Sequence, residues 1–202
     1  MVSLVMRREP HSQQTDSVIA RLPYPATMVI WLTGLSGAGK TTLARAIHER
    51  LTRSGRDATI FDGDELRATV SRDLGFTKRD RDEQVRRVAK LAVDAAGSDR
   101  IAIVALISPY RAARESARAL ASGQYPFIEV YLECPVEELS RRDPKGLYRG
   151  AAAGEVKNLT GISDPYEVPQ NPELRIDTSR VTVDTATEQV VRRIGAFLSS
   201  SP

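Results

Sequence analysis

One octapeptide and its flanks constrain the fold of this chain more than any other feature. Residues 34–41 read Gly-Leu-Ser-Gly-Ala-Gly-Lys-Thr, directly after the apolar run at 28–32 and directly before a helical pattern. A strand, a glycine-rich turn and a helix in this order form a phosphate-binding P-loop, because the backbone N–H groups of the turn and the positive end of the helix dipole point at the same spot. The sequence therefore predicts that the chain binds a nucleoside triphosphate.

Each residue type in this loop suits the binding of phosphate. Glycine at 34, 37 and 39 allows a close approach that a β-carbon would block, Lys40 can reach the β- and γ-phosphates, and Thr41 can ligate Mg²⁺. The alternative is an ordinary glycine turn, which the Lys-Thr pair and the flanking strand and helix disfavour. The expected ATP site comprises Gly34, Leu35, Ser36, Gly37, Ala38, Gly39, Lys40, Thr41 and Thr42.

Composition limits the class of protein and of partner. The chain has 202 residues, 41% of them hydrophobic, which suffices for one domain with a buried core. Its net charge of +3 is spread along the chain and favours an anionic small substrate over nucleic acid. No apolar run approaches the roughly 20 residues that span a bilayer, and no signal peptide is recognisable, so we expect a cytoplasmic protein without membrane contact. The single cysteine, Cys134, is expected to be a packed, reduced thiol.

Short apolar runs alternate with longer helical patterns along the chain. Residues 1–25 show no sustained period, which predicts a mobile arm before a domain at 26–202. Because strands that alternate with helices form parallel sheets covered on both faces, the fold class is α/β with a five-stranded parallel sheet. Ligands should gather at the carboxyl ends of its strands, beside the P-loop. The expected strands are 28–32, 58–61, 101–107, 127–132 and 174–176, and the expected helices are 40–53, 82–97, 110–121, 136–142 and one after Asp184.

Three polar segments follow at those strand ends, and each has a second interpretation. Asp62-Gly63-Asp64 supplies carboxylates for an acceptor hydroxyl or for a water bound to Mg²⁺, but it also suits a turn that caps a helix. The segment 73–87 contains a phenylalanine that can stack on a base and arginines that can bind sulfate or phosphate; spacing alone favours a solvated helix face. Ile107-Ser108-Pro109 is equally a strand end with proline at the first position of a helix.

The segment 141–167 is too rich in charge, glycine and alanine to be core, and it is long for a passive connection. A lid that closes over bound nucleotide would account for both properties. A loosely ordered surface loop is the alternative.

Together these segments resemble one family, adenylylsulfate kinase, also called APS kinase. The resemblance implies a P-loop NTPase fold and transfer of the γ-phosphoryl group of ATP, with Mg²⁺, to the 3′-hydroxyl of adenosine 5′-phosphosulfate. The family is commonly dimeric, which implies a homodimer, and any coupling to an ATP sulfurylase must be to a separate chain. The resemblance runs to about residue 178 and rests on six motifs: the P-loop, Asp62-Gly63-Asp64 with Arg67, and the segments at 73–76, 107–111, 143–148 and 161–167.

The resemblance also implies residue roles. Asp64 would lie by the acceptor hydroxyl, Arg67 and Arg81 would hold the phosphosulfate, and Phe76 would stack on the adenine. Ser108 matches a serine assigned in the family to a phosphoserine intermediate; direct in-line transfer needs none, so we expect it to position substrate. The expected catalytic residues are Lys40, Asp64 and Ser108, the metal ligand is Thr41, and the substrate-binding residues are Asp64, Arg67, Phe76, Arg81, Gln84, Ile107, Ser108 and, from a lid at about 143–167, Lys145 and Leu147.

Two departures from the family lie on the acceptor side. Gln84 stands where the family usually has asparagine, and Ala68-Thr69-Val70-Ser71 replaces a His-Gly-Leu-Asn run. Both bear on acceptor affinity or identity more than on the use of ATP.

Two other functions remain open at this point. A P-loop kinase for another small-molecule hydroxyl, such as that of gluconate, would keep the P-loop without needing Arg67, Phe76 and Arg81 together. A non-catalytic nucleotide-binding regulator would usually carry an Asn-Lys-x-Asp motif, which the sequence lacks.

Overall fold

The computed structural model describes residues 27–199, and the arm expected at 1–25 lies outside them. Its five strands form one parallel sheet in the order β2-β3-β1-β4-β5, with the strand that precedes the P-loop at the centre. The strands are β1 (Met28–Thr33), β2 (Ala58–Asp62), β3 (Ile101–Ala105), β4 (Phe127–Glu133) and β5 (Leu174–Asp177). The helices are α2 (Lys40–Arg53), α3 (Gly63–Ala68), α4 (Lys78–Ala96), α5 (Arg111–Ala121), α6 (Val136–Arg142), α7 (Leu147–Ala152) and α8 (Val183–Ser199).

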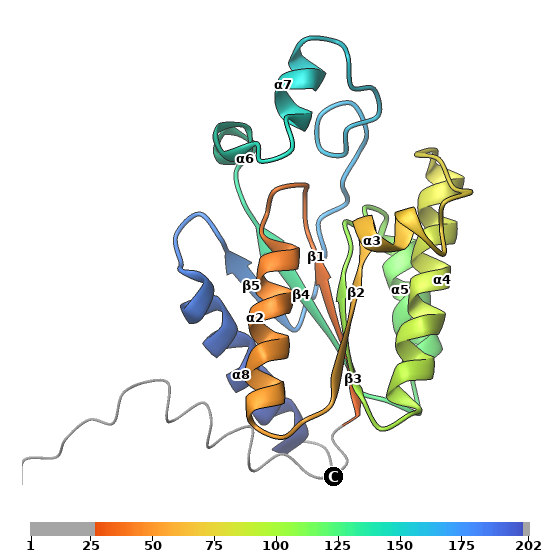
Figure 1. Cartoon of the computed structure of the whole chain (residues 1–202), viewed down its shortest axis with the longest axis vertical. Coiled ribbons are helices and arrows are strands. Elements are labelled where there is room, and N and C mark those ends of the chain that lie inside the picture. Colours follow the sequence, from red (N-terminus) through yellow and green to blue (C-terminus); the bar gives the residue numbers. More distant parts are fainter. Residues whose placement is uncertain (1–26, 200–202) are drawn as a thin grey trace, which may run out of the picture.

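Helices cover both faces of the sheet. Figure 1 shows α2 and α8 on one face and α4 and α5 on the other. Successive residues of β1 point to opposite faces, so Met28, Ile30 and Leu32 join the core beneath α2 and α8, whereas Val29 and Trp31 join the core beneath α4 and α5. This double burial explains why the strand reads as a continuous apolar run. The predicted α/β class is therefore confirmed.

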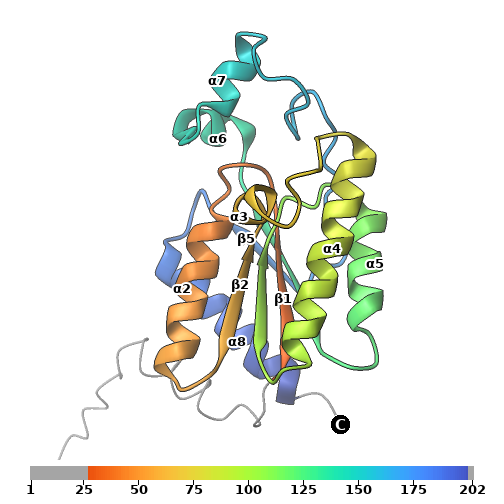
Figure 2. The same cartoon turned by 45° about the vertical axis from the view of Figure 1, so that its right-hand side comes forward.

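The segments that the sequence analysis singled out follow the carboxyl ends of the strands. Since all five strands are parallel, the P-loop after β1, α3 after β2 and the turn after β3 meet at one edge. Helices α6 and α7 lie beyond this edge, apart from the helices that cover the two faces of the sheet (Figures 1 and 2). Within the described residues, none of the helices has the length and hydrophobicity that a membrane crossing needs.

Several boundaries differ from those expected, and local capping explains two of the differences. The expected turn at 62–64 opens a short helix, α3, because the Asp62 side chain accepts hydrogen bonds from the backbone N–H groups of Asp64 and Glu65. Helix α4 begins at Lys78 rather than 82, because Thr77 and Asp80 form a reciprocal capping box. Strand β3 ends at Ala105 rather than 107, α8 begins at Val183, and α7 was not expected as a helix.

Candidate active site

A cavity of about 570 Å³ opens at the carboxyl edge, between the P-loop, α3, the start of α4 and the segment 143–167, which we call the lid after its expected role. All the expected substrate-binding residues line it: Asp64, Arg67, Phe76, Arg81, Gln84, Ile107, Ser108, Lys145 and Leu147. From the P-loop and the start of α2, the lining residues are Ser36, Gly37, Gly39, Lys40, Thr41 and Thr42. The structure thus brings residues from six separate segments into one cavity.

Three of the expected ATP-site residues, Gly34, Leu35 and Ala38, do not line the cavity, and their surroundings show how they shape the P-loop instead. A β-carbon on Gly34 would lie 2.5 Å from the Leu132 carbonyl oxygen, so only glycine lets the loop leave β1 this close to β4. Ala38 is fully buried, and the Leu35 side chain packs against Gly161 of the lid. These residues therefore fix the shape of the loop through packing rather than by lining the cavity.

Lys40 is the first residue of α2, and its side chain reaches back to the start of the P-loop. Its Nζ donates hydrogen bonds to the Gly34 and Leu35 carbonyl oxygens, at 2.9 and 2.8 Å. Burial, helped by the nearby charge of Lys145, lowers the pKa of Lys40 to about 8, although Asp64 and Asp62 act in the opposite direction. The negative charge of a polyphosphate bound in the loop would stabilise the charged form of this ammonium group.

Thr41 and Asp62 place a hydroxyl and a carboxylate next to each other beside the loop. Thr41 Oγ1 donates to Asp62 Oδ2 at 2.6 Å, and Asp62 is buried at the end of β2. Hydroxyl and carboxylate oxygens suit Mg²⁺, which keeps most of its shell as water and phosphate oxygen and rarely uses an all-protein cage. Residues 27–199 contain no cluster of three or more His, Cys, Asp or Glu side chains that could hold a metal ion. The residues present therefore fit Mg²⁺ bound together with a nucleotide.

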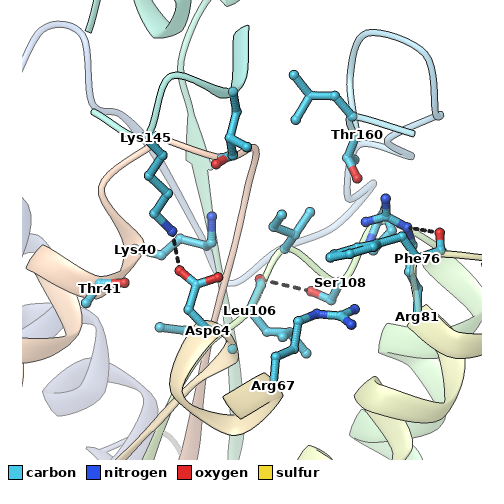
Figure 3. A pocket seen from close by; sticks show the side chains of 18 of the residues that line it. Lys40, Thr41, Asp64, Arg67, Phe76, Arg81, Leu106, Ser108, Lys145 and Thr160 are labelled. Atoms are coloured by element: carbon cyan, nitrogen blue, oxygen red, sulfur yellow. Dashed lines mark hydrogen bonds and ion pairs between the residues drawn. The ribbon is translucent and has the colours of Figure 1, made fainter. Parts of the chain in front are cut away.

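Asp64 and Lys145 face each other across the mouth of the cavity. Asp64 projects from α3, and the Lys145 ammonium from the lid forms an ion pair with its carboxylate (Figure 3). Both side chains are more than half exposed, at 69% and 51%. A carboxylate and a lid cation thus stand together next to the P-loop lysine.

Phe76, Arg67 and Arg81 form the far wall, and we call these three residues the acceptor cluster. The Phe76 ring is 56% exposed and has both guanidinium groups near it, with Arg67 at 4.5 Å and Arg81 at 5.7 Å from the ring centroid. Arg67 Nη1 also donates to the Leu74 and Gly75 carbonyl oxygens. An aromatic face beside two fixed cations can take an aromatic base that carries an anionic group.

Gln84 and Ser108 are buried at the base of the cavity. Gln84 Nε2 donates to the Gly63 carbonyl oxygen at 3.1 Å and so supports the turn that carries Asp64. The Ser108 hydroxyl is fully buried; it accepts a hydrogen bond from Trp31 Nε1 and donates to Thr33 Oγ1. The backbone of Ser108 has φ of +42°, a strained value for a residue other than glycine.

Some lining residues had not been assigned from the sequence. Asp62 belongs to the Asp62-Gly63-Asp64 motif, but nothing in the sequence distinguishes it from Asp64 as the partner of Thr41. The lid residues at 156–160 also line the cavity, and the Thr160 hydroxyl is buried there without a hydrogen-bond partner in the described part of the chain. They carry no motif of their own, so only the path of the lid reveals them.

Comparison with known proteins agrees with this geometry. The family model of adenylylsulphate kinase matches residues 26–177. An adenylyl-sulfate kinase of Staphylococcus epidermidis is 47% identical, covering 81% of this chain and 82% of that protein, and one of Halothermothrix orenii is 48% identical, covering 81% and 87%. The structure of the Mycobacterium tuberculosis APS kinase CysC in complex with AMPPNP and APS superimposes with a TM-score of 0.82 at 37% identity, covering 84% of this chain and 98% of that one. The chain belongs to the adenylylsulfate kinase family.

Proposed function

We propose that this chain transfers the γ-phosphoryl group of ATP to the ribose 3′-hydroxyl of adenosine 5′-phosphosulfate and releases 3′-phosphoadenylyl sulfate and ADP. One observation carries the proposal: the P-loop and the acceptor cluster line the same cavity, with Asp64 among its lining residues. The exposed Phe76 ring suits an adenine, and Arg67 and Arg81 suit a phosphosulfate attached to it. Membership of the family supports the same substrates.

In this mechanism the protein mainly positions the reactants and neutralises charge. Lys40 turns from the two loop carbonyls to the β- and γ-phosphates, and Lys145 leaves Asp64 for the transferring group. Asp64 then orients the 3′-hydroxyl and accepts its proton. The 3′-oxygen bonds to the γ-phosphorus as the bond from that phosphorus to the β–γ bridging oxygen breaks, and ADP leaves.

The proposal includes Mg²⁺, for which Thr41 would be the ligand and Asp62 the carboxylate that holds its water. The ion supplies positive charge against the phosphate oxygens. It also includes a homodimer, a cytoplasmic location and a separate ATP sulfurylase as the source of substrate, all on the strength of the family resemblance. Sedimentation velocity tests the homodimer, and a single-chain mass at micromolar concentration would contradict it.

The test of function is ADP release from Mg·ATP with different acceptors. Purified protein should turn over with micromolar adenosine 5′-phosphosulfate and not with adenosine, AMP or gluconate. Turnover with another acceptor would mean that the acceptor cluster is wrongly assigned, and no turnover with any of them would contradict the proposed kinase activity.

A pair of lysine variants ties this activity to the P-loop. Lys40→Ala should reduce turnover at least about a hundredfold, since a preorganised charge at the transferring group contributes on that scale. Lys90→Ala is the matched control, because Lys90 is exposed on α4 and pairs only with Asp94 among the described residues. Retention of more than about a tenth of the activity by Lys40→Ala would refute the role given to Lys40.

A further inference from the structure

Arg81 joins two segments that are far apart in the sequence. Its side chain is 7% exposed, and Nε donates to the Phe76 carbonyl oxygen at 2.9 Å. Nη2 donates to the Asn158 carbonyl oxygen at 2.6 Å and to Asp164 Oδ2 at 3.1 Å. Within residues 27–199, Nη1 has no hydrogen-bond partner, so this nitrogen remains for a ligand in the cavity that Arg81 lines.

The segment 158–164 is a closed turn whose shape brings these acceptors to Arg81. The backbone N–H groups of residues 162–164 all donate to the Leu159 carbonyl oxygen, and Gly161 N–H donates back to the Asp164 carbonyl oxygen at 2.7 Å. Asn158 adopts a left-handed φ of +61° at the start of the turn. Asp164 therefore reaches Arg81 from a locally fixed backbone rather than from a free chain.

The opposite side of this turn rests on the P-loop. A β-carbon on Gly161 would lie 2.6 Å from Leu35 Cδ2, and Gly161 has φ of +89°. Thr160, from the same turn, lies on the side of the cavity where Phe76 and Arg81 are found (Figure 3). The turn is thus held between the P-loop and the acceptor cluster.

The Asp164 carboxylate has two opposing physical effects on anion binding. Its negative charge weakens the positive field around Arg81, which would loosen an anionic acceptor. Its hydrogen bond fixes a long, flexible side chain, so that less conformational entropy is lost when the acceptor binds. The burial of Arg81 and its three fixed contacts favour the second effect.

We propose that Asp164 is a positioning residue of the acceptor site, whose carboxylate orients the Arg81 guanidinium toward the anionic group of the acceptor. The inference rests on the proposed role of Arg81 in binding adenosine 5′-phosphosulfate. Asp164 itself need not touch the substrate.

The test separates the KM values of the two substrates. Asp164→Ala should raise the KM for adenosine 5′-phosphosulfate about tenfold, the scale of one charge-assisted hydrogen bond, with the KM for ATP and kcat within about twofold of wild type. Asp164→Asn should shift the acceptor KM in the same direction. Because it keeps the size of the side chain, it replaces the alanine variant in the test if that variant folds poorly. An acceptor KM that is unchanged or lower in both variants overturns the proposal.

A double-mutant cycle shows whether Asp164 acts through Arg81. Arg81→Ala should raise the acceptor KM, and adding Asp164→Ala to it should produce no further rise; additive effects overturn the inference. If Arg81→Ala raises the KM and Asp164→Ala does not, only the inference fails. If Arg81→Ala leaves the KM unchanged, the proposed role of Arg81 fails and the inference fails with it.

Asp57→Ala is the matched control. Asp57 pairs with Arg100 at 3.0 Å, and both side chains are exposed at the opposite edge of the sheet. The Asp57→Ala variant removes an aspartate–arginine pair with an N–O distance similar to that of Asp164 and Arg81, and it should leave both KM values unchanged. Thermal unfolding of each variant completes the comparison.

Discussion

At the scale of single residues, the charge of Lys40 depends on its surroundings. Its pKa of about 8 in the unliganded protein results first from burial and then from the ammonium group of Lys145. Above this pH the free protein has a mostly neutral Lys40, and binding a triphosphate then requires uptake of a proton. The P-loop should therefore capture nucleotide best below pH 8.

The first prediction concerns this pH dependence. kcat/KM for Mg·ATP, which reports on the free enzyme, should fall as pH rises above about 8. Lys145→Ala should shift this fall to higher pH, because Lys145 lowers the pKa of Lys40 whereas Asp64, freed of its partner, raises it. Nucleotide affinity measured across the same pH range provides the check, with Lys90→Ala as the control. A fall that stays in place or moves to lower pH in Lys145→Ala would contradict this account.

The expected positions of residues in a recognisable motif were predictable from the sequence, but the residues that they contact in the fold were not. Lys40 and Thr41 follow from the P-loop pattern, because the loop geometry itself dictates which residue types can occupy those positions. The bond from Thr41 to Asp62 depends on how close β2 comes to α2, which spacing alone does not reveal. Similarly, Cys134 is a buried free thiol, as expected, but its neighbours come from the fold.

At the scale of elements, the lid contacts the P-loop at two places, one in its first part and one in its last part. Tyr148 in α7 is 6% exposed, and its hydroxyl donates to the Ser36 carbonyl oxygen at 2.8 Å. In the last part of the lid, Gly161 packs against Leu35. Movement of the lid should therefore change the loop that holds the ATP phosphates.

Tyr148→Phe tests this coupling by removing one hydroxyl group. The Ser36 carbonyl loses a buried donor, so we expect the KM for ATP to rise about two- to tenfold, in line with one hydrogen bond of roughly 0.5–1.5 kcal/mol. The KM for the acceptor should change less. Tyr125→Phe is the control, since Tyr125 lies near Gly97, on the side of the molecule away from the P-loop. Equal changes in both KM values would show that the lid does not act on the nucleotide side in particular.

Most elements were predictable, including the five strands and the short helix α6, but the two six-residue helices were not. Helices α2 and α5 lie where the apolar period placed them, because that period needs several turns to stand out. Helices α3 and α7 have six residues each, too few for a periodic signal. Helix α7 depends on Asp143, whose carboxylate accepts from the backbone N–H groups of Tyr148 and Arg149, a cap visible only in three dimensions.

At the scale of the whole molecule, a buried charge network joins the end of the lid to the sheet. Arg114 in α5 is 3% exposed and donates to Glu129 Oε1 in β4 at 2.8 Å. It also donates to the carbonyl oxygens of Ser108 and Glu167, both at 2.6 Å. Sequence patterns identified a parallel sheet but neither its strand order nor this network, because both depend on partners far apart in the chain.

Arg114→Leu should therefore destabilise the entire fold rather than one loop. The change leaves Glu129 buried with Arg118, at 3.6 Å, as its one remaining cation within residues 27–199, and removing one partner of a buried pair costs about 3–5 kcal/mol. Because total stability is typically about 5–15 kcal/mol, denaturant unfolding should show a large fall in midpoint. Replacing Glu129 by Leu in the same protein should recover part of this loss, since no unpaired carboxylate then remains buried. If the double variant is no more stable than Arg114→Leu, the cost lies in the contacts to the Ser108 and Glu167 carbonyls, and the network acts by holding the turn after β3 rather than by pairing charge.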